Sequence, residues 1–302
     1  MAKKRAKSSK SSSAPLGDKV IRDMNQAVER HQSGDLNGAQ KLYKRVLAKA
    51  PQLTDARHYL GLVHYQLGEY PLALHQLERA VSEQPQNPGL LSNLGLVLTE
   101  LKRPREAVDY FEQALAISPD FDDARNNLGN AFSELGEHAK AIACFESVLT
   151  RDPNNAGTLD NLGIALHACG ELTKAKETYE QALSIAPTSA KTRNNLGTLL
   201  KQQGLIAQSM EQFIAALTAD PTLAEVHLNF ATALQMNGDI EKAEAHYQQA
   251  SELQPDIEGA KTGLGQCLLA RGEHLQGLSQ IAAADGVIEF LPDPSKLPMV
   301  RF

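Results

Sequence analysis

RNNLGNAF occupies residues 125–132, and RNNLGTLL occupies residues 193–200. The two stretches share their first five residues and lie 68 positions apart, which indicates an internal repeat. Prolines supply the period, because seven of them recur at intervals of 34 residues: Pro51, Pro85, Pro119, Pro153, Pro187, Pro221 and Pro255. Eight units of 34 residues then begin at Val20, Thr54, Pro88, Asp122, Ala156, Ala190, Ala224 and Glu258.

Residue size is conserved along the unit at several positions. Position 8 is glycine or alanine in every unit, position 20 is alanine, serine or glycine, and position 24 is large and apolar or aromatic. Apolar faces recur at positions 7, 8 and 11 and again at positions 20, 24 and 27. Glycine stands at position 15 in seven units, where a helix would stop, and the closing proline prevents the second helix from continuing. Each unit is therefore predicted to be a helical hairpin whose helices approach closely at the small residues.

This pattern resembles the tetratricopeptide repeat family, whose 34-residue helix-turn-helix unit has these size preferences. The resemblance covers roughly residues 18–286 and implies an all-α fold, a right-handed superhelical solenoid of about eight units. Position 4 departs from the family pattern, because tryptophan is absent and Arg57, Leu91, Arg125 and Arg193 stand there. The first and eighth units are the least regular, as expected of capping repeats.

The two ends of the chain differ from the repeats in composition. Residues 1–17 hold five basic residues and no acidic one, which leaves 25 basic against 36 acidic residues, a net charge of −11, for the remaining chain. We predict that this basic arm is disordered and either solubilises the protein or meets an acidic partner or nucleic acid. Residues 287–302 contain Pro292, Pro294 and Pro298 among apolar residues, so we expect an extended tail that caps the last unit. A partner-docking strand and an occupant of the protein's own groove are the alternatives for this tail.

Neither a membrane span nor a chemical site emerges from the sequence. No apolar run approaches the roughly 20 residues that a spanning helix needs, and the N-terminus lacks the apolar stretch of a secretory signal. Three cysteines, Cys144, Cys169 and Cys267, suggest reduced thiols in a cytoplasmic protein. There is no phosphate loop or zinc spacing, and the histidines are not spaced as metal pairs. We therefore predict a protein that is not an enzyme and has no cofactor or metal.

Position 6 is asparagine in six of the eight units: Asn25, Asn93, Asn127, Asn161, Asn195 and Asn229. Asparagine is unfavourable inside a helix because its amide competes with the backbone, so its repetition calls for a reason. The family resemblance implies that positions 2, 5, 6, 9, 12 and 13 of each first helix face a concave groove. Each amide offers both a donor and an acceptor, so a ladder of them can hold the main chain of an extended peptide.

A similar asparagine ladder lines the repeat superhelix of protein O-GlcNAc transferases, although no room remains here for a catalytic domain of that type. The predicted groove residues are Asn93, Asn126, Asn127, Asn130, Asn161, Lys191, Asn194, Asn195, Lys201 and Asn229. The alternative is that these amides bond neighbouring units and hold the superhelix together. A carboxylate-binding groove of the chaperone-binding type is disfavoured, because Asn126 and Asn195 replace two of the three cations that such a groove uses.

The resemblance implies a scaffold or adaptor that binds an extended protein segment in its groove. Two alternatives remain open. The chain could recruit substrates for a separately encoded glycosyl- or sulfotransferase, since related repeats are often fused to such enzymes. It could also be a helical-repeat nucleic-acid binder, although a repeat region with net charge −11 argues against binding a polyanion.

Overall fold

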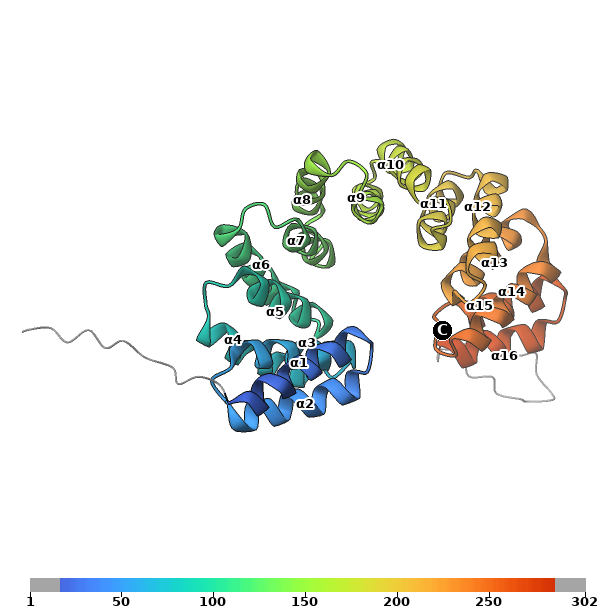
Figure 1. Cartoon of the computed structure of the whole chain (residues 1–302). Helices are drawn as coiled ribbons and strands as arrows, with labels where there is room; N and C mark the ends of the chain where they lie inside the picture. Colours follow the sequence, from blue (N-terminus) through green and yellow to red (C-terminus); the bar gives the residue numbers. More distant parts are fainter. Residues whose placement is uncertain (1–16, 286–302) are drawn as a thin grey trace, which may run out of the picture. The chain divides into compact units, whose positions relative to one another are not determined.

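The computed structural model describes residues 17–285, and within them the chain forms sixteen α-helices and no strand (Figure 1). The all-α prediction is confirmed. The first helices of the hairpins are α1 (Asp18–Gln32), α3 (Thr54–Gln66), α5 (Pro88–Glu100), α7 (Asp122–Glu134), α9 (Ala156–Ala168), α11 (Ala190–Gln202), α13 (Ala224–Asn237) and α15 (Ala260–Ala270). The second helices are α2 (Leu36–Lys49), α4 (Tyr70–Glu83), α6 (Pro104–Ile117), α8 (His138–Arg151), α10 (Leu172–Ile185), α12 (Ile206–Ala219), α14 (Ile240–Leu253) and α16 (His274–Asp285). The predictions for the basic arm and for the tail of residues 287–302 concern segments outside the described residues.

The helices fall into two compact units, one ending at Glu137 and the other beginning at His138, so the division falls inside the fourth hairpin. In the first unit, α3 contacts α1 and α5, and α5 contacts α7. In the second unit, α11 contacts α9 and α13, and α13 contacts α15. Successive first helices therefore lie side by side within each unit. We call the surface that they form the first-helix face of that unit.

Each hairpin is closed by a large side chain that lies against a glycine. A Cβ atom added at Gly95 would lie 2.7 Å from the Phe111 ring, and one added at Gly197 would lie 2.7 Å from the Phe213 ring. Both rings are fully buried. The small residue at position 8 is therefore required because the ring at position 24 occupies the space that a side chain would take, which confirms the predicted close approach of the two helices.

The turn inside each hairpin uses a left-handed residue at position 15. Seven glycines there have φ between 74° and 89°. Glycine adopts this conformation without a steric penalty, because it has no Cβ. The third hairpin has Lys102 at the same position with φ 59°, the one non-glycine residue of positive φ in residues 17–285. The turn is thus imposed by the hairpin and tolerated by lysine at an energetic cost.

Position 4, where the family pattern has tryptophan, carries a joint between consecutive hairpins. Arg193 donates from Nε (3.0 Å) and Nη2 (2.7 Å) to the carbonyl oxygen of Pro187, six residues earlier. Arg57 and Arg125 donate to the carbonyl oxygens of their own preceding prolines in the same way. These guanidinium groups satisfy a carbonyl left free where the second helix has ended, so arginine replaces tryptophan with a bonding role of its own.

Candidate functional site

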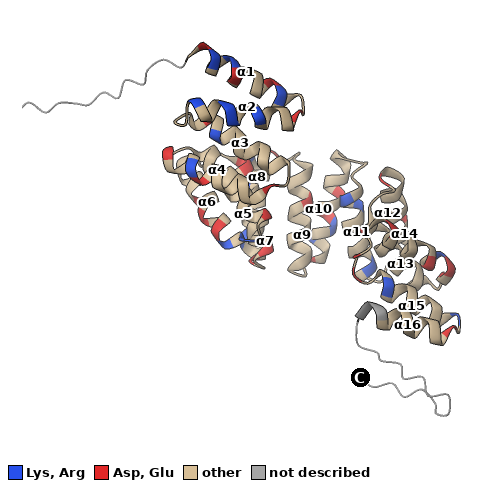
Figure 2. Ribbon diagram, turned by 90° about the horizontal axis from the view of Figure 1, so that it is seen from below, with Lys and Arg blue, Asp and Glu red and all other residues tan. Residues whose placement is uncertain are grey.

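The first-helix faces carry few charged residues. Helices α5 and α9 each contain a single one, Glu100 and Asp160, and both helices are almost wholly tan in Figure 2. The predicted groove residues lie on these faces in two sets, because the chain divides into two units. The first unit holds Asn93, Asn126, Asn127 and Asn130, and the second unit holds Asn161, Lys191, Asn194, Asn195, Lys201 and Asn229.

In the second unit, a buried carboxylate links two successive first helices. The Asn195 amide on α11 donates from Nδ2 to Oδ1 of Asp160 on α9 over 3.0 Å. Nζ of Lys191 lies 3.3 Å from the other carboxylate oxygen, Oδ2. Asp160 is only 4% exposed, so these two groups provide the partners that a buried carboxylate needs. Asn195 thus binds the neighbouring repeat.

The next pair of first helices repeats this arrangement with different chemistry. Asn229 on α13 donates from Nδ2 to Oδ1 of Asn194 over 3.1 Å, and Asn194 donates from Nδ2 to Oε1 of Glu225 over 3.3 Å. In both steps, position 5 of one repeat is bonded by positions 2 and 6 of the next. An acid at position 5 pairs with lysine at position 2, whereas an amide at position 5 pairs with glutamate, so the pairing is complementary.

Lysine 201 extends this second step. Its Nζ atom lies 3.5 Å from Oδ1 of Asn229, and burial lowers the pKa of the amine. An aliphatic stem that is packed against the helices places its head group at the edge of the ladder. Lys201 and Asn229 therefore lie together, as expected of residues predicted for the same surface.

The first unit contains one bond of the same kind. Nδ2 of Asn93 on α5 lies 2.8 Å from Nε2 of His58 on α3, and the two residues are again 35 positions apart. Because the amide nitrogen donates, the facing ring nitrogen of His58 accepts and the ring is neutral. Burial lowers the pKa of His58, which favours this neutral form. Asn93 therefore also bonds the preceding repeat.

Two predicted amides have no such role. Asn127 and Asn130 on α7 make no side-chain hydrogen bond with any other residue between 17 and 285, and both are half-buried. Asn126 on the same helix and Asn161 on α9 are half-buried as well. The ladder therefore divides into amides that hold neighbouring repeats, which are Asn93, Asn194, Asn195 and Asn229, and the unbonded pair on α7. Partner binding by these residues stays a prediction.

A cavity of about 680 Å³ adjoins the bonded residues in the second unit. Lys191, Asn194 and Asn195 line one side, and Leu223, Ala224, Glu225 and Val226 line another, together with Thr222, Leu253 and Gln254. The Lys191 side chain is 68% exposed at its rim. This cavity combines an apolar floor with amides and charges of both signs, which suits a polar chain that carries apolar side chains.

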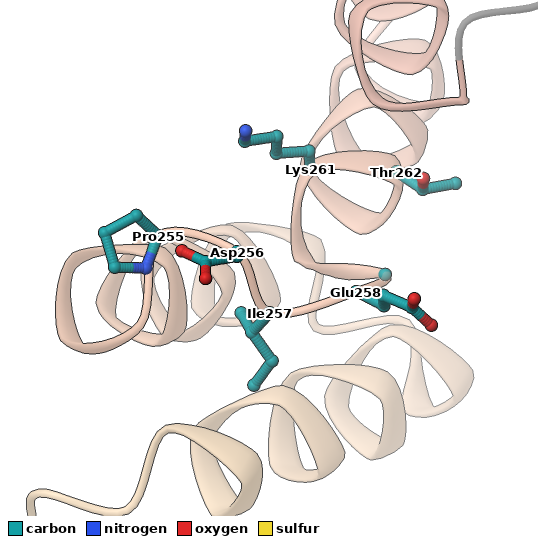
Figure 3. A pocket seen from close by; sticks show the side chains of 7 residues that line it. Pro255, Asp256, Ile257, Glu258, Lys261 and Thr262 are labelled. Atoms are coloured by element: carbon teal, nitrogen blue, oxygen red, sulfur yellow. The ribbon is translucent and has the colours of Figure 1, made fainter.

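A second, smaller cavity of about 460 Å³ lies at the turn between α14 and α15. Figure 3 shows Pro255, Asp256, Ile257 and Glu258 on the turn, with Lys261 and Thr262 following on α15. Helix α15 begins at Ala260, two positions into its repeat, and its N-cap Gly259 has φ 83°. The predicted groove residues do not line this cavity.

Other kinds of site were sought in the described part of the chain. Among residues 17–285, no cluster of three or more histidine, cysteine or acidic side chains is arranged to hold a metal ion. No described helix has the length and apolarity to cross a membrane. All three cysteines are free, and burial raises the pKa of the Cys267 thiol.

The residues that sequence reasoning missed are the partners of the ladder. Asp160, Glu225 and His58 accept its hydrogen bonds, and none was predicted as a member of the site. Their signal was a recurring separation of 35 residues between positions 5 and 6, and of 31 residues between positions 5 and 2. Residues at such separations meet only if adjacent first helices lie in register, which the hydrophobic pattern alone does not establish.

Comparison with known families agrees with this geometry. Tetratricopeptide repeat models match residues 25–88, 60–121 and 228–285, residues 98–162 and residues 190–223, and a TPR repeat model matches residues 163–204. The chain belongs to the tetratricopeptide repeat family. This tetratricopeptide repeat protein matches no curated protein sequence.

Solved tetratricopeptide repeat structures share its fold at low sequence identity. A tetratricopeptide repeat protein from Parabacteroides merdae is 18% identical with a TM-score of 0.72, over 83% of this chain and all of that one. The APC/C hetero-tetramer Cut9–Hcn1 gives 16% identity and a TM-score of 0.69, over 80% of this chain and 48% of that one. MamA gives 24% identity and a TM-score of 0.52, over 58% of this chain and 96% of that one. At these identities the likeness concerns the fold alone.

Proposed function

We propose that this tetratricopeptide repeat protein is a scaffold or adaptor, without catalysis of its own, that binds an extended protein segment along its first-helix faces. Tetratricopeptide repeat proteins are generally scaffolds for protein–protein interaction. The observation that carries the proposal is the pair of amides at Asn127 and Asn130. They lie three residues apart on one side of α7, half-buried and unbonded within the described residues.

Asparagine inside a helix costs stability relative to alanine. Asn195 and Asn229 offset that cost with bonds to the preceding repeat, whereas Asn127 and Asn130 have no such return. An incoming main chain can supply the missing partners, because each amide both donates and accepts. The same reasoning extends to Asn195, whose carbonyl oxygen and second N–H are not used by its bond to Asp160.

Binding through amides favours a partner in extended form. The exposed N–H and C=O groups of such a segment are free to bond, whereas those of a helix are already paired. The cavity beside Asn195 adds apolar surface for its side chains. The expected partner is therefore an extended polypeptide recognised largely through its backbone, with one or more side chains held in the second unit.

Site-specific cross-linking locates the partner directly. A photo-reactive amino acid replaces Ser133 on α7, and a control replaces the exposed Ala116 on α6, which belongs to a second helix. In extract from the native cell, we expect a specific protein cross-link from position 133 and none from position 116. A specific cross-link from position 116 alone would place the partner on the wrong surface and contradict the proposal.

The identified partner then allows a quantitative test with the double variant Asn127→Ala/Asn130→Ala. Two lost hydrogen bonds of about 1 kcal/mol each correspond to roughly thirtyfold weaker binding. Melting should not fall, because alanine is the better helix former and no internal bond is removed. Unchanged affinity in a folded double variant would remove these amides from the binding site.

A further inference from the structure

The first hairpin differs in charge from the rest of its unit. Residues 18–53 contain seven basic and four acidic residues, a net charge of +3, whereas residues 54–137 contain six basic and thirteen acidic residues, a net charge of −7. Helix α2 contains no acidic residue, while each of α4, α6, α8, α10, α12 and α14 contains at least one. Figure 2 shows the basic residues of α2 in blue.

The cations of α2 gather on its exposed side. Lys41, Arg45 and Lys49 follow one another at intervals of four residues, so they share one face of the helix, and Lys44 lies beside them. We call Lys41, Lys44, Arg45 and Lys49 the α2 basic face. All four residues are exposed.

Two of these cations are held in place and two are not. Arg45 donates from Nε (3.0 Å) and Nη2 (2.7 Å) to the two carboxylate oxygens of Asp23 on α1, and Lys49 lies 3.1 Å from the same carboxylate. Asp23 is 6% exposed and lies under this face. Lys41 and Lys44 make no ion pair with any residue between 17 and 285. The face therefore has a fixed end and a pair of cations without acidic partners.

The size and surroundings of this face indicate the kind of anion that fits it. From Lys41 to Lys49 the face is about 12 Å long, at a helix rise of 1.5 Å per residue. A long polyanion such as a nucleic-acid duplex would extend beyond it towards repeats of net charge −7, which repel it. The α2 aromatic residue Tyr43 is fully buried, so the face also lacks a ring on which bases could stack. A short run of carboxylates matches both the length and the charge.

We propose that the α2 basic face is a second docking surface, which binds a short acidic segment of a protein partner. It lies on a second helix and so is separate from the first-helix face. The unpaired Lys41 and Lys44 supply the attraction, and Arg45 and Lys49 extend it along the helix. Such an interaction accelerates association and weakens with salt, because exposed charges are screened within about 8 Å at physiological ionic strength.

The test uses the full chain and a fluorescein-labelled peptide of six glutamates, with a peptide of six glutamines as the neutral control. Fluorescence anisotropy measures binding of each peptide to the wild-type protein, to Lys41→Glu/Lys44→Glu and to Lys174→Glu/Lys176→Glu. The last variant reverses two lysines on α10 in the second unit and makes the same change in net charge. A Lys41→Gln/Lys44→Gln variant neutralises the same lysines if charge reversal prevents folding.

We expect the glutamate peptide to bind more tightly than the glutamine peptide, and increasingly so at low salt. The Lys41/Lys44 variants should lose about tenfold in affinity, while Lys174→Glu/Lys176→Glu and Asn127→Ala/Asn130→Ala bind as the wild type does. Equal loss in the α10 control would show only a net-charge effect and overturn the proposal. Binding of a 20-base-pair DNA duplex or of phosphatidylserine vesicles through Lys41 and Lys44, without binding of the glutamate peptide, would also overturn it.

Discussion

Replacing Asn195 by alanine should weaken the second unit between α9 and α11. The substitution removes the 3.0 Å bond from Nδ2 of Asn195 to Asp160, a carboxylate that is 4% exposed. A hydrogen bond to a charged group contributes about 1.5–3 kcal/mol, and the better helix propensity of alanine returns roughly 0.5 kcal/mol. The net loss is therefore about 1–2.5 kcal/mol, with Lys191 left as the printed partner of Asp160 at 3.3 Å.

Urea unfolding followed by circular dichroism measures the loss, and amide hydrogen exchange locates it. Repeat arrays unfold in parts because each repeat contacts only its neighbours, so faster exchange should be concentrated in α9 and α11. The control is Asn127→Ala, which makes the same substitution at the same repeat position without removing an internal bond. The Asp160→Ala/Asn195→Ala double variant should show a coupling energy of about 1–2 kcal/mol. Equal stability of Asn195→Ala and the wild type, or equal losses in Asn195→Ala and Asn127→Ala, would refute the assignment of Asn195 to the ladder.

Two further predictions follow from the joints and turns. His227 replaces arginine at position 4, bonds the Pro221 carbonyl oxygen from Nε2 (3.0 Å) and shares a proton with His246 between Nδ1 atoms 2.9 Å apart. Burial, and then His227, lower the pKa of His246, so its contribution to stability is complete above the unfolded pKa of about 6.5 and is lost as the pH falls through its lowered folded value. His227→Arg/His246→Gln copies the sixth repeat and should reduce the fall in urea midpoint between pH 7.5 and pH 5.5; an unchanged pH dependence would exclude this pair as its source. Lys102→Gly should raise the unfolding free energy by about 0.5–1 kcal/mol by relieving a left-handed turn, whereas Lys102→Ala keeps the Cβ and should not; stabilisation by both would refute the backbone explanation.

The acid sensitivity predicted for His246 depends on the charges around the pair. His227 comes from α13, His246 from α14 and the Pro221 carbonyl from the preceding turn, while the Phe230 ring lies 4.6 Å from the His246 ring. The nearest acidic groups along the chain are bonded elsewhere, Asp220 to Thr222 and Glu225 to Asn194. Protonating Nδ1 of His227 would set two donors against each other, which is why the neutral pair is the stable one.

The repeat and its hairpins could be predicted from the sequence because they rest on size. Gly197 must be small because the Phe213 ring lies against it, and this relation recurs every 34 residues in the sequence itself. The turn at position 15 was readable for the same reason, since seven glycines mark it. Lys102 was the exception, because a lysine carries no sign of left-handed geometry.

The candidate site could be predicted only in part. The asparagine column was visible, but its division into bonded and unbonded amides depends on which residue stands at position 5 of the preceding repeat. Asp160 and His58 offer acceptors to Asn195 and Asn93. Likewise, the arginines at position 4 were seen as a missing tryptophan, although each stands six residues after a proline whose carbonyl it bonds. Such pairs depend on the helix-to-helix register, which packing sets.

Hydrogen exchange of the protein with and without its purified partner tests the central claim most directly. If an extended segment binds the first-helix faces, the partner should slow exchange in α5, α7, α9, α11 and α13. Side chains of α4, α6, α10 and α12 face away from such a segment, so exchange in those second helices should change least. The account predicts the largest protection around Asn127 and Asn130 on α7. Protection confined to the second helices, with α7 and α11 unchanged, would contradict it.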